Sequence, residues 1–300
     1  MKRFFSVLLV LMMLPVWGAS AAKSKATPTP APMDITTEVV EPPLPIQRLL
    51  NIAWQDWQDA AGRPQIIKSQ KNSKGKKVVI NKYTQWYNQY FWNSNGWCAG
   101  FVTWCMIEAG LTKLDEEATE KKGEPVWVGW DEIKKWPEEV PEPIFSSADS
   151  TPSGLFSSYQ HFGRITTVPQ KGFIALYGNQ STKFVHVGIV YDVEPLGEGK
   201  FRLTTIEGAM GVDTVRMYVY DYDMNAKQVK NITAVPKEER DREESDMFQY
   251  TLKATSKKPW FITKFLMPWV PGDDFSQYEA EGEAESASGA SAAETPEPED

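Results

Sequence analysis

The stretch NSNGWCAGFVTWCMIEAG, residues Asn93 to Gly110, joins a short polar loop to an apolar pattern and contains both cysteines of the chain. Cys98 stands at the junction between the two parts. Residues at spacings of one, three and four form one apolar stripe on a helix, and here that stripe consists of Phe101, Val102, Cys105 and Ala109. The pattern predicts a helix that ends at Gly110 and packs by this stripe.

The two cysteines have three alternative roles: a disulfide, a nucleophile or a buried core residue. Seven helical residues rise about 10.5 Å along the axis, whereas a disulfide needs Cα atoms within about 7 Å. We therefore expect no bridge between Cys98 and Cys105. Cys105 lies in the stripe and is expected to be a small core residue. Cys98 is expected at the helix entrance, where free N–H groups and the helix dipole lower the pKa of a thiol.

Helical and strand patterns follow one another along the chain. Residues 44–62 have apolar positions at helical spacing, the basic stretch KSQKNSKGKK reads as a loop, and residues 112–168 form a long segment that contains short helices. Strand patterns then follow in KGFIALYG, FVHVGIVYDV, KFRLTTIEGA, DTVRMYVYDY and PWFITKFLMPW. Helices followed by a run of antiparallel strands predict the α+β class.

Both ends of the chain differ from the middle in composition. Residues 1–22 have the layout of a secretory signal peptide, with an apolar run too short to span a membrane, so we expect an exported protein, periplasmic or secreted, with no membrane span after cleavage. Residues 23–43 read as a disordered Pro/Thr linker and residues 272–300 as a disordered acidic tail. The folded domain is expected over residues 44–271. Without the signal and the tail, 30 basic and 30 acidic residues remain, which gives no electrostatic case for nucleic-acid binding.

A nucleophilic cysteine needs a histidine to take its proton and a polar group to orient that histidine. The chain has two histidines. His161 is expected in a packing or surface role, whereas His186 lies in a strand pattern, on the face opposite Val185, Val187 and Ile189. Glu207 ends the next strand pattern. Cysteine on a helix, histidine on one strand and glutamate on the next is the order that a papain-like site requires.

Other chemistries have less support in the sequence. No pair of cysteines or histidines has chelating spacing, so no metal is predicted. A G-x-S-x-G elbow and a phosphate-binding glycine loop are both absent from the sequence. We predict no cofactor.

NKYTQWYN, GWCAGFVTWCMIEAGL, HVGIV and TIEG, in this order, resemble the CHAP domain of cysteine- and histidine-dependent amidohydrolases and peptidases, related to NlpC/P60 enzymes. The resemblance covers about residues 44–222 and implies a papain-like α+β core, with N-terminal helices on an antiparallel sheet. Residues 112–168 would be an insertion between the nucleophile helix and the histidine strand. The resemblance also implies Cys98 as nucleophile, His186 as general base and Glu207 as the group that orients it.

The resemblance implies a peptidoglycan hydrolase, either an N-acetylmuramoyl-L-alanine amidase or an endopeptidase, with peptidoglycan or its stem peptide as substrate. The sequence departs from the family at Ala209, where members often have Asn after Glu-Gly. The alternative is therefore a catalytically weakened CHAP-like binding or scaffolding module. Trp97, Trp127 and Trp130 are candidate substrate contacts, and the insertion or the acidic tail could dock a protein partner.

Overall fold

The computed structural model describes residues 35–71, 75, 77–85, 96–138, 142–178, 184–210, 213–227, 231–235 and 260–278. The helices are α1 (Leu44–Ala60), α2 (Lys82–Gln85), α3 (Cys98–Glu108), α4 (Glu116–Lys122), α5 (Trp130–Ile133) and α6 (Pro152–His161). The strands are β1 (Lys68–Lys71), β2 (Lys77–Ile80), β3 (Ile165–Thr166), β4 (Ile174–Gly178), β5 (Phe184–Gly197), β6 (Lys200–Met210), β7 (Thr214–Asp223), β8 (Ile232–Ala234) and β9 (Phe261–Leu266).

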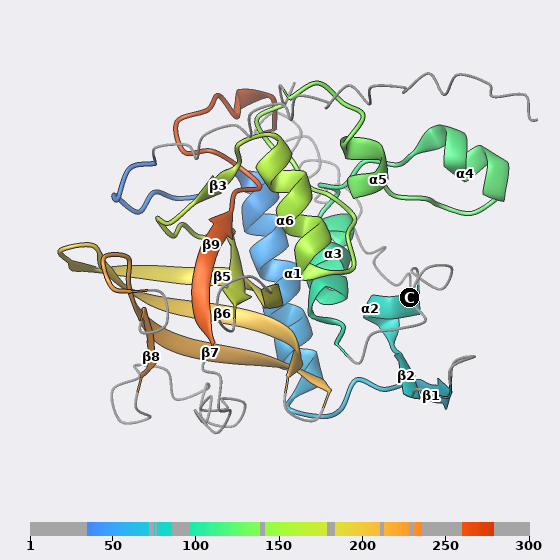
Figure 1. Cartoon of the computed structure of the whole chain (residues 1–300), viewed down its shortest axis with the longest axis horizontal. Coiled ribbons are helices and arrows are strands. Elements are labelled where there is room, and N and C mark those ends of the chain that lie inside the picture. Colours follow the sequence, from blue (N-terminus) through green and yellow to red (C-terminus); the bar gives the residue numbers. More distant parts are fainter. Residues whose placement is uncertain are drawn as a thin grey trace, which may run out of the picture.

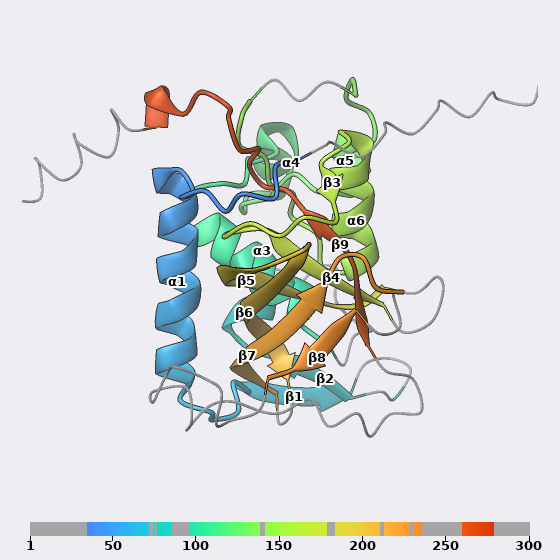
Figure 2. The ribbon, with the colours of Figure 1, turned by 90° about the vertical axis from the view of Figure 1, so that its left-hand side faces the viewer.

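The larger sheet has the strand order β3-β9-β4-β5-β6-β7-β8, and all of its pairs are antiparallel. The helices α1, α3 and α6 lie together beside this sheet (Figure 1). The prediction of an α+β fold with helices on an antiparallel sheet is thus confirmed at the level of its class. The predicted loop KSQKNSKGKK was wrong in part, because β1 and β2 form a separate antiparallel pair there, below the main sheet in Figure 2.

The first helix begins at a proline-rich boundary. Pro45 lies in its first turn, where a missing N–H group costs nothing, and Ala61 ends it in the left-handed conformation. Its buried residues recur at helical spacing, and Ile46, Leu49, Ala53 and Trp57 are all completely buried. α1 therefore has one continuous apolar face and contacts β5, β6 and β7; it is the blue helix at the left of Figure 2.

Strand alternation places the two faces of the sheet in two separate cores. Val187, Ile189 and Ile206 pack with α1, α3 and α6 in the first core. Val190 and Leu203 belong to the second core on the opposite face. Because side chains alternate along a strand, His186 and Glu207 project to the second face, away from the bulk of α3.

The helix α3 is more deeply buried than its stripe predicts. Phe101, Val102 and Cys105 are buried as expected, but Ala99, Gly100 and Thr103 are buried as well. The predicted stripe is therefore buried, and the burial extends beyond it because α3 contacts α1, β5 and β6 and also α2 and α6. Most residues of α3 are therefore buried, and within the helix only Glu108 is exposed.

The segment 112–168 contributes to the same core as α3. Leu155, Tyr159 and Phe162 are buried in the first cluster. The backbone oxygen of Asp149 accepts a hydrogen bond from Thr103 Oγ1 at 2.7 Å. The Asp149 carboxylate in turn accepts hydrogen bonds from Ser147 and Ser158. The end of this segment is therefore fixed on α3, while α4 has no buried residue and projects from the body in Figure 1.

Residues on both sides of the predicted range 44–271 also pack against the folded domain. Gln170 is completely buried, accepts a hydrogen bond from the backbone N–H of Val40 at 3.1 Å and donates one to the carbonyl of Glu38 at 2.6 Å. Beyond the other boundary, the ring of Phe275 packs edge-on to Trp269. The predicted signal peptide and most of the acidic tail lie outside the described residues.

Candidate active site

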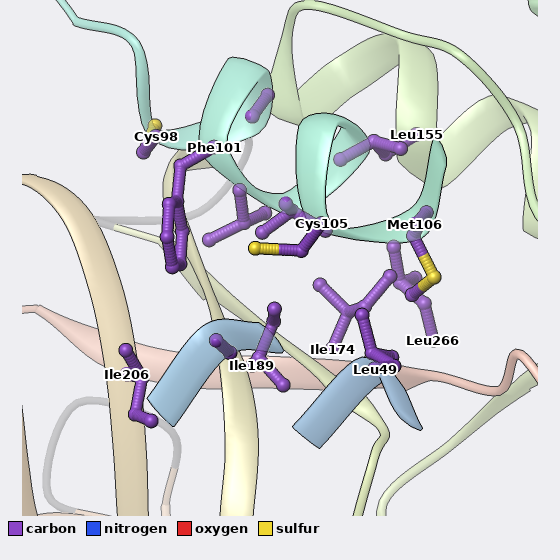
Figure 3. Packing of buried hydrophobic residues seen from close by; sticks show 14 of the residues in the cluster. Leu49, Cys98, Phe101, Cys105, Met106, Leu155, Ile174, Ile189, Ile206 and Leu266 are labelled. Carbon is purple, nitrogen blue, oxygen red and sulfur yellow. The ribbon is translucent and has the colours of Figure 1, made fainter. Parts of the chain in front are cut away.

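Cys98 is the first residue of α3, and this residue is 5% exposed. Both cysteines are free and buried, which confirms that they form no disulfide with one another. Figure 3 shows Cys105 within the core cluster, above Ile189, whereas Cys98 lies at the start of the helix, at the edge of that cluster. The two thiols of one helix therefore occupy different surroundings, as predicted.

The Cys98 thiol has a strong electrostatic partner in His186. Burial acts to raise the pKa of Cys98, but the charge of His186, a hydrogen bond with its ring and hydrogen bonds from the backbone N–H groups of Val187 and Ala99 lower it overall. Burial, with a contribution from the charge of Asp56, raises the pKa of Cys105 well above its ordinary value. Only Cys98 has the surroundings that favour a thiolate.

His186 lies in β5, is 3% exposed, and its Nε2 atom lies 2.7 Å from Oε2 of Glu207. With Nε2 engaged by the carboxylate, Nδ1 is the ring nitrogen left for Cys98. Burial acts to lower the pKa of His186, but the negative charges of Cys98 and Glu207 and the hydrogen bonds with both raise it to about 10. The three side chains thus form one hydrogen-bonded series that favours a thiolate, an imidazolium and a carboxylate.

The Glu207 carboxylate is completely buried, and its two oxygen atoms have different partners. Oε2 faces His186. Oε1 accepts hydrogen bonds from Tyr177 Oη and Thr205 Oγ1, both at 2.7 Å, and a longer one of 3.4 Å from Tyr220 Oη. A buried carboxylate needs such donors to remain charged. Sequence reasoning missed these three hydroxyl groups, although Tyr177 lies opposite His186 in the register of β4 and β5.

Two glycines leave the space that this arrangement needs. A Cβ atom at Gly188 would lie 2.5 Å from Cγ of Glu207, and one at Gly208 would lie 2.5 Å from Cβ of Phe101 and 2.8 Å from the Trp97 ring. The register of β5 with β6 begins at Ile189, so the two strands carry His186 and Glu207 beyond their paired region. Gly188 admits the glutamate side chain there, and Gly208 lets β6 approach α3.

Ala209 has a backbone φ of 63°, in the left-handed region, within an irregularity of the β6–β7 register. This conformation is unfavourable for alanine and is tolerated by asparagine. The position therefore has a backbone suited to the asparagine that the sequence lacks. The alanine side chain brings no polar group to the site, but the Cys98–His186–Glu207 series is complete without one.

Trp260 lies over the histidine. Its ring stacks on the imidazole of His186, with centroids 5.0 Å apart and planes at 28°. Nothing in the sequence pattern signals this contact, because the tryptophan lies 74 positions beyond the histidine and precedes β9.

The three tryptophans predicted to contact substrate lie in different places. Trp97 is 3% exposed and its ring stacks on Tyr83 at 4.8 Å, so it packs beneath the site. Trp127 forms an isolated bridge with Leu114, beyond the C-terminal end of α3. Trp130 begins α5 and packs edge-on to His161. The role of these three tryptophans in binding substrate stays a prediction.

The second histidine of the chain, His161, has a backbone carbonyl as its partner. His161 Nε2 lies 3.0 Å from the carbonyl oxygen of Trp136, which agrees with the packing role expected for it.

Within the described ranges, no group of three His, Cys, Asp or Glu residues is arranged to hold a metal ion. In the same part of the chain, no helix is both long and apolar enough to cross a bilayer.

Comparison with known proteins gives one match. The family model of the CHAP domain matches residues 87–209. No curated protein and no solved structure matches the chain. CHAP domains are in general cysteine- and histidine-dependent amidohydrolases or peptidases. The matched range contains Cys98, His186 and Glu207 and ends at Ala209, and over these residues the chain is similar to a CHAP domain.

Proposed function

We propose that this protein is an exported, thiol-dependent peptidoglycan hydrolase, an N-acetylmuramoyl-L-alanine amidase or an endopeptidase of the stem peptide or cross-bridge. The observation that carries the proposal is the buried hydrogen-bonded series from Cys98 through His186 to Glu207, within the segment that matches the CHAP model. The signal peptide predicted in residues 1–22 supports a substrate outside the cytoplasm.

The reaction would begin with the thiol proton already on His186. The Cys98 thiolate attacks the carbonyl carbon of the scissile amide and forms a tetrahedral intermediate. The backbone N–H of Cys98, at the entrance of α3, is a donor for the oxyanion. His186 then gives its proton to the leaving amine, the C–N bond breaks and a thioester remains on Cys98.

Water completes the cycle. His186, now neutral, takes a proton from a water molecule that attacks the thioester, and the second tetrahedral intermediate releases the carboxylic acid product. The thiolate leaves and the imidazole retains the proton, which restores the starting pair. Glu207 keeps the ring oriented with Nε2 toward itself and stabilises its positive charge in both halves of the reaction.

A second candidate function is a CHAP-like module that binds the wall without cutting it, and Ala209 favours it. Purified murein incubated with the full chain, under reducing conditions and over a range of pH, separates the two. We expect new amines and shortened muropeptides, and mass spectrometry of these products identifies the bond that is cut. Co-sedimentation of the chain with murein that stays intact would instead support the binding module and contradict the hydrolase.

A further inference from the structure

Three hydroxyl groups surround one oxygen of the buried glutamate. We propose that Tyr177 is a positioning residue of this site: with Thr205 and Tyr220, it holds the Glu207 carboxylate so that the proton shared with His186 stays on the imidazole. The inference deepens the proposed hydrolase function and rests on it, because both depend on the series Cys98, His186 and Glu207.

The geometry divides the carboxylate into two halves. Oε1 receives the hydroxyl hydrogen bonds, of which those from Tyr177 and Thr205 are short, at 2.7 Å, whereas Oε2 is left for His186 at the same distance. Tyr177, Thr205 and Glu207 are completely buried, so water does not replace a lost donor without a rearrangement. The carboxylate therefore depends on these hydroxyl groups for both its orientation and its charge.

A hydrogen bond donated to a carboxylate stabilises the charged form and lowers its proton affinity. Without these donors, burial would favour a protonated Glu207, which would take the proton from His186. A neutral imidazole would no longer stabilise the Cys98 thiolate and would have no proton for the leaving amine. The hydroxyl groups thus keep the proton on the imidazole of His186, where the reaction needs it.

The tyrosines remain donors throughout. Burial, followed by the negative charge of Glu207, raises the pKa of Tyr177 and of Tyr220 well above the ordinary value of a phenol. The other ionisable groups around the pair are Cys98 from α3 and Tyr218 and Arg216 from β7, where Arg216 pairs with Glu207 in the strand register. Among the three hydroxyl donors, Tyr177 and Thr205 make the shorter contacts to the carboxylate, at 2.7 Å, and Tyr220 makes the longer one, at 3.4 Å.

The test uses the fact that the chain has two histidines. In protein with ¹⁵N-labelled histidine, the ring nitrogens of His186 report where the proton lies, and those of His161 report that the fold is intact. At pH 8 we expect a protonated Nε2 in the unchanged protein. In Tyr177→Phe the Nε2 signal should move toward the value of an unprotonated ring nitrogen, because the carboxylate that has lost a donor holds the proton more tightly.

Two further variants keep the test decisive. Thr205→Val is close in shape and should move the signal in the same direction, even if Tyr177→Phe folds poorly. Tyr222→Phe removes a buried phenol that donates to the carbonyl of Thr167 instead of Glu207, and it should leave the signal unchanged. An unmoved Nε2 signal in both Tyr177→Phe and Thr205→Val, with the His161 signals in place, would overturn the inference.

Kinetics provide the second measurement. Loss of a hydrogen bond to a charged group should lower kcat about tenfold with KM unchanged in Tyr177→Phe, because the hydroxyl acts through Glu207 and does not touch substrate. If Tyr222→Phe lowers kcat by the same factor, the effect reflects a general loss of stability, and the assignment of Tyr177 is contradicted. The NMR result needs no substrate, so it stands or falls separately from the proposed hydrolase function.

Discussion

Nε2 of His186 and Oε2 of Glu207 lie 2.7 Å apart, and both side chains are almost completely buried. A buried ion pair stabilises a charge only when both members keep their partners, and breaking one side is costly. Here the histidine has the Cys98 thiol as its second partner and the glutamate has three hydroxyl groups. The His186–Glu207 pair therefore connects the Cys98 thiol on α3 to buried hydroxyl groups on β4, β6 and β7.

The first prediction concerns the pH dependence of the reaction. The active form needs a thiolate, which is present above the lowered pKa of Cys98, and an imidazolium, which is present below the raised pKa of His186, about 10. We expect initial rates of amine release to rise at a pH below the usual thiol range, to stay level and to fall near pH 10. A single rise near pH 9 with no fall would contradict the ion pair.

The second prediction concerns Gly188. A Cβ atom there would lie 2.5 Å from Cγ of Glu207, so Gly188→Ala should displace the carboxylate from His186. We expect the free energy of unfolding to fall by about 1–3 kcal/mol and kcat to fall with it. Urea denaturation and steady-state kinetics measure the two effects.

A double variant provides the control for this packing argument. Glu207→Asp removes one methylene at the point of contact, so its destabilising effect and that of Gly188→Ala should be less than additive when the two are combined. Strict additivity in urea denaturation would mean that the two residues do not interfere and that the close approach is irrelevant.

The third prediction concerns the backbone at Ala209. Its φ of 63° is strained for alanine by roughly 1–2 kcal/mol, whereas glycine adopts it freely. After the entropy that glycine loses on folding, Ala209→Gly should raise the free energy of unfolding by about 0.5–1 kcal/mol. Ala175→Gly, at a buried strand position of β4, should lower it. If both variants are destabilised alike, the strain at Ala209 is absent.

The fourth prediction concerns the ring that covers the histidine. Trp260 stacks on the imidazole, and an aromatic face stabilises a cation next to it by about 0.5–2 kcal/mol. Trp260→Ala should therefore lower kcat about tenfold, whereas Trp260→Phe should retain most of the activity. Equal kcat values for the two variants would show that the aromatic face has no part in the reaction.

The sequence predicts the elements with strong periodicity and misses those without it. The helices α1 and α3 and the strands β4 to β7 and β9 follow from apolar spacing, and the alternation around Val187 and Ile189 places His186 on the opposite face. The strands β1 and β2 were missed because KSQKNSKGKK has no apolar alternation. Both β3 and β8 are too short to produce a pattern.

The candidate site divides in the same way. Cys98, His186 and Glu207 are predicted because each lies at a recognisable place in a helix or strand pattern. Tyr177 and Thr205 reach the carboxylate through strand register, and Trp260 reaches the histidine from a distant segment. Such contacts depend on how β4, β5 and β6 pair and on what covers them, which spacing along the chain does not encode.

The central claim is that Cys98 is the nucleophile of an amide hydrolase, and one measurement tests it most directly. The rate of amine release from purified murein is compared between the unchanged chain, Cys98→Ser and Cys105→Ala. We predict that Cys98→Ser loses the activity by about 10³-fold or more, whereas Cys105→Ala, which changes the buried thiol of the same helix, keeps it. Activity that persists in Cys98→Ser at the rate of the unchanged chain would contradict the claim.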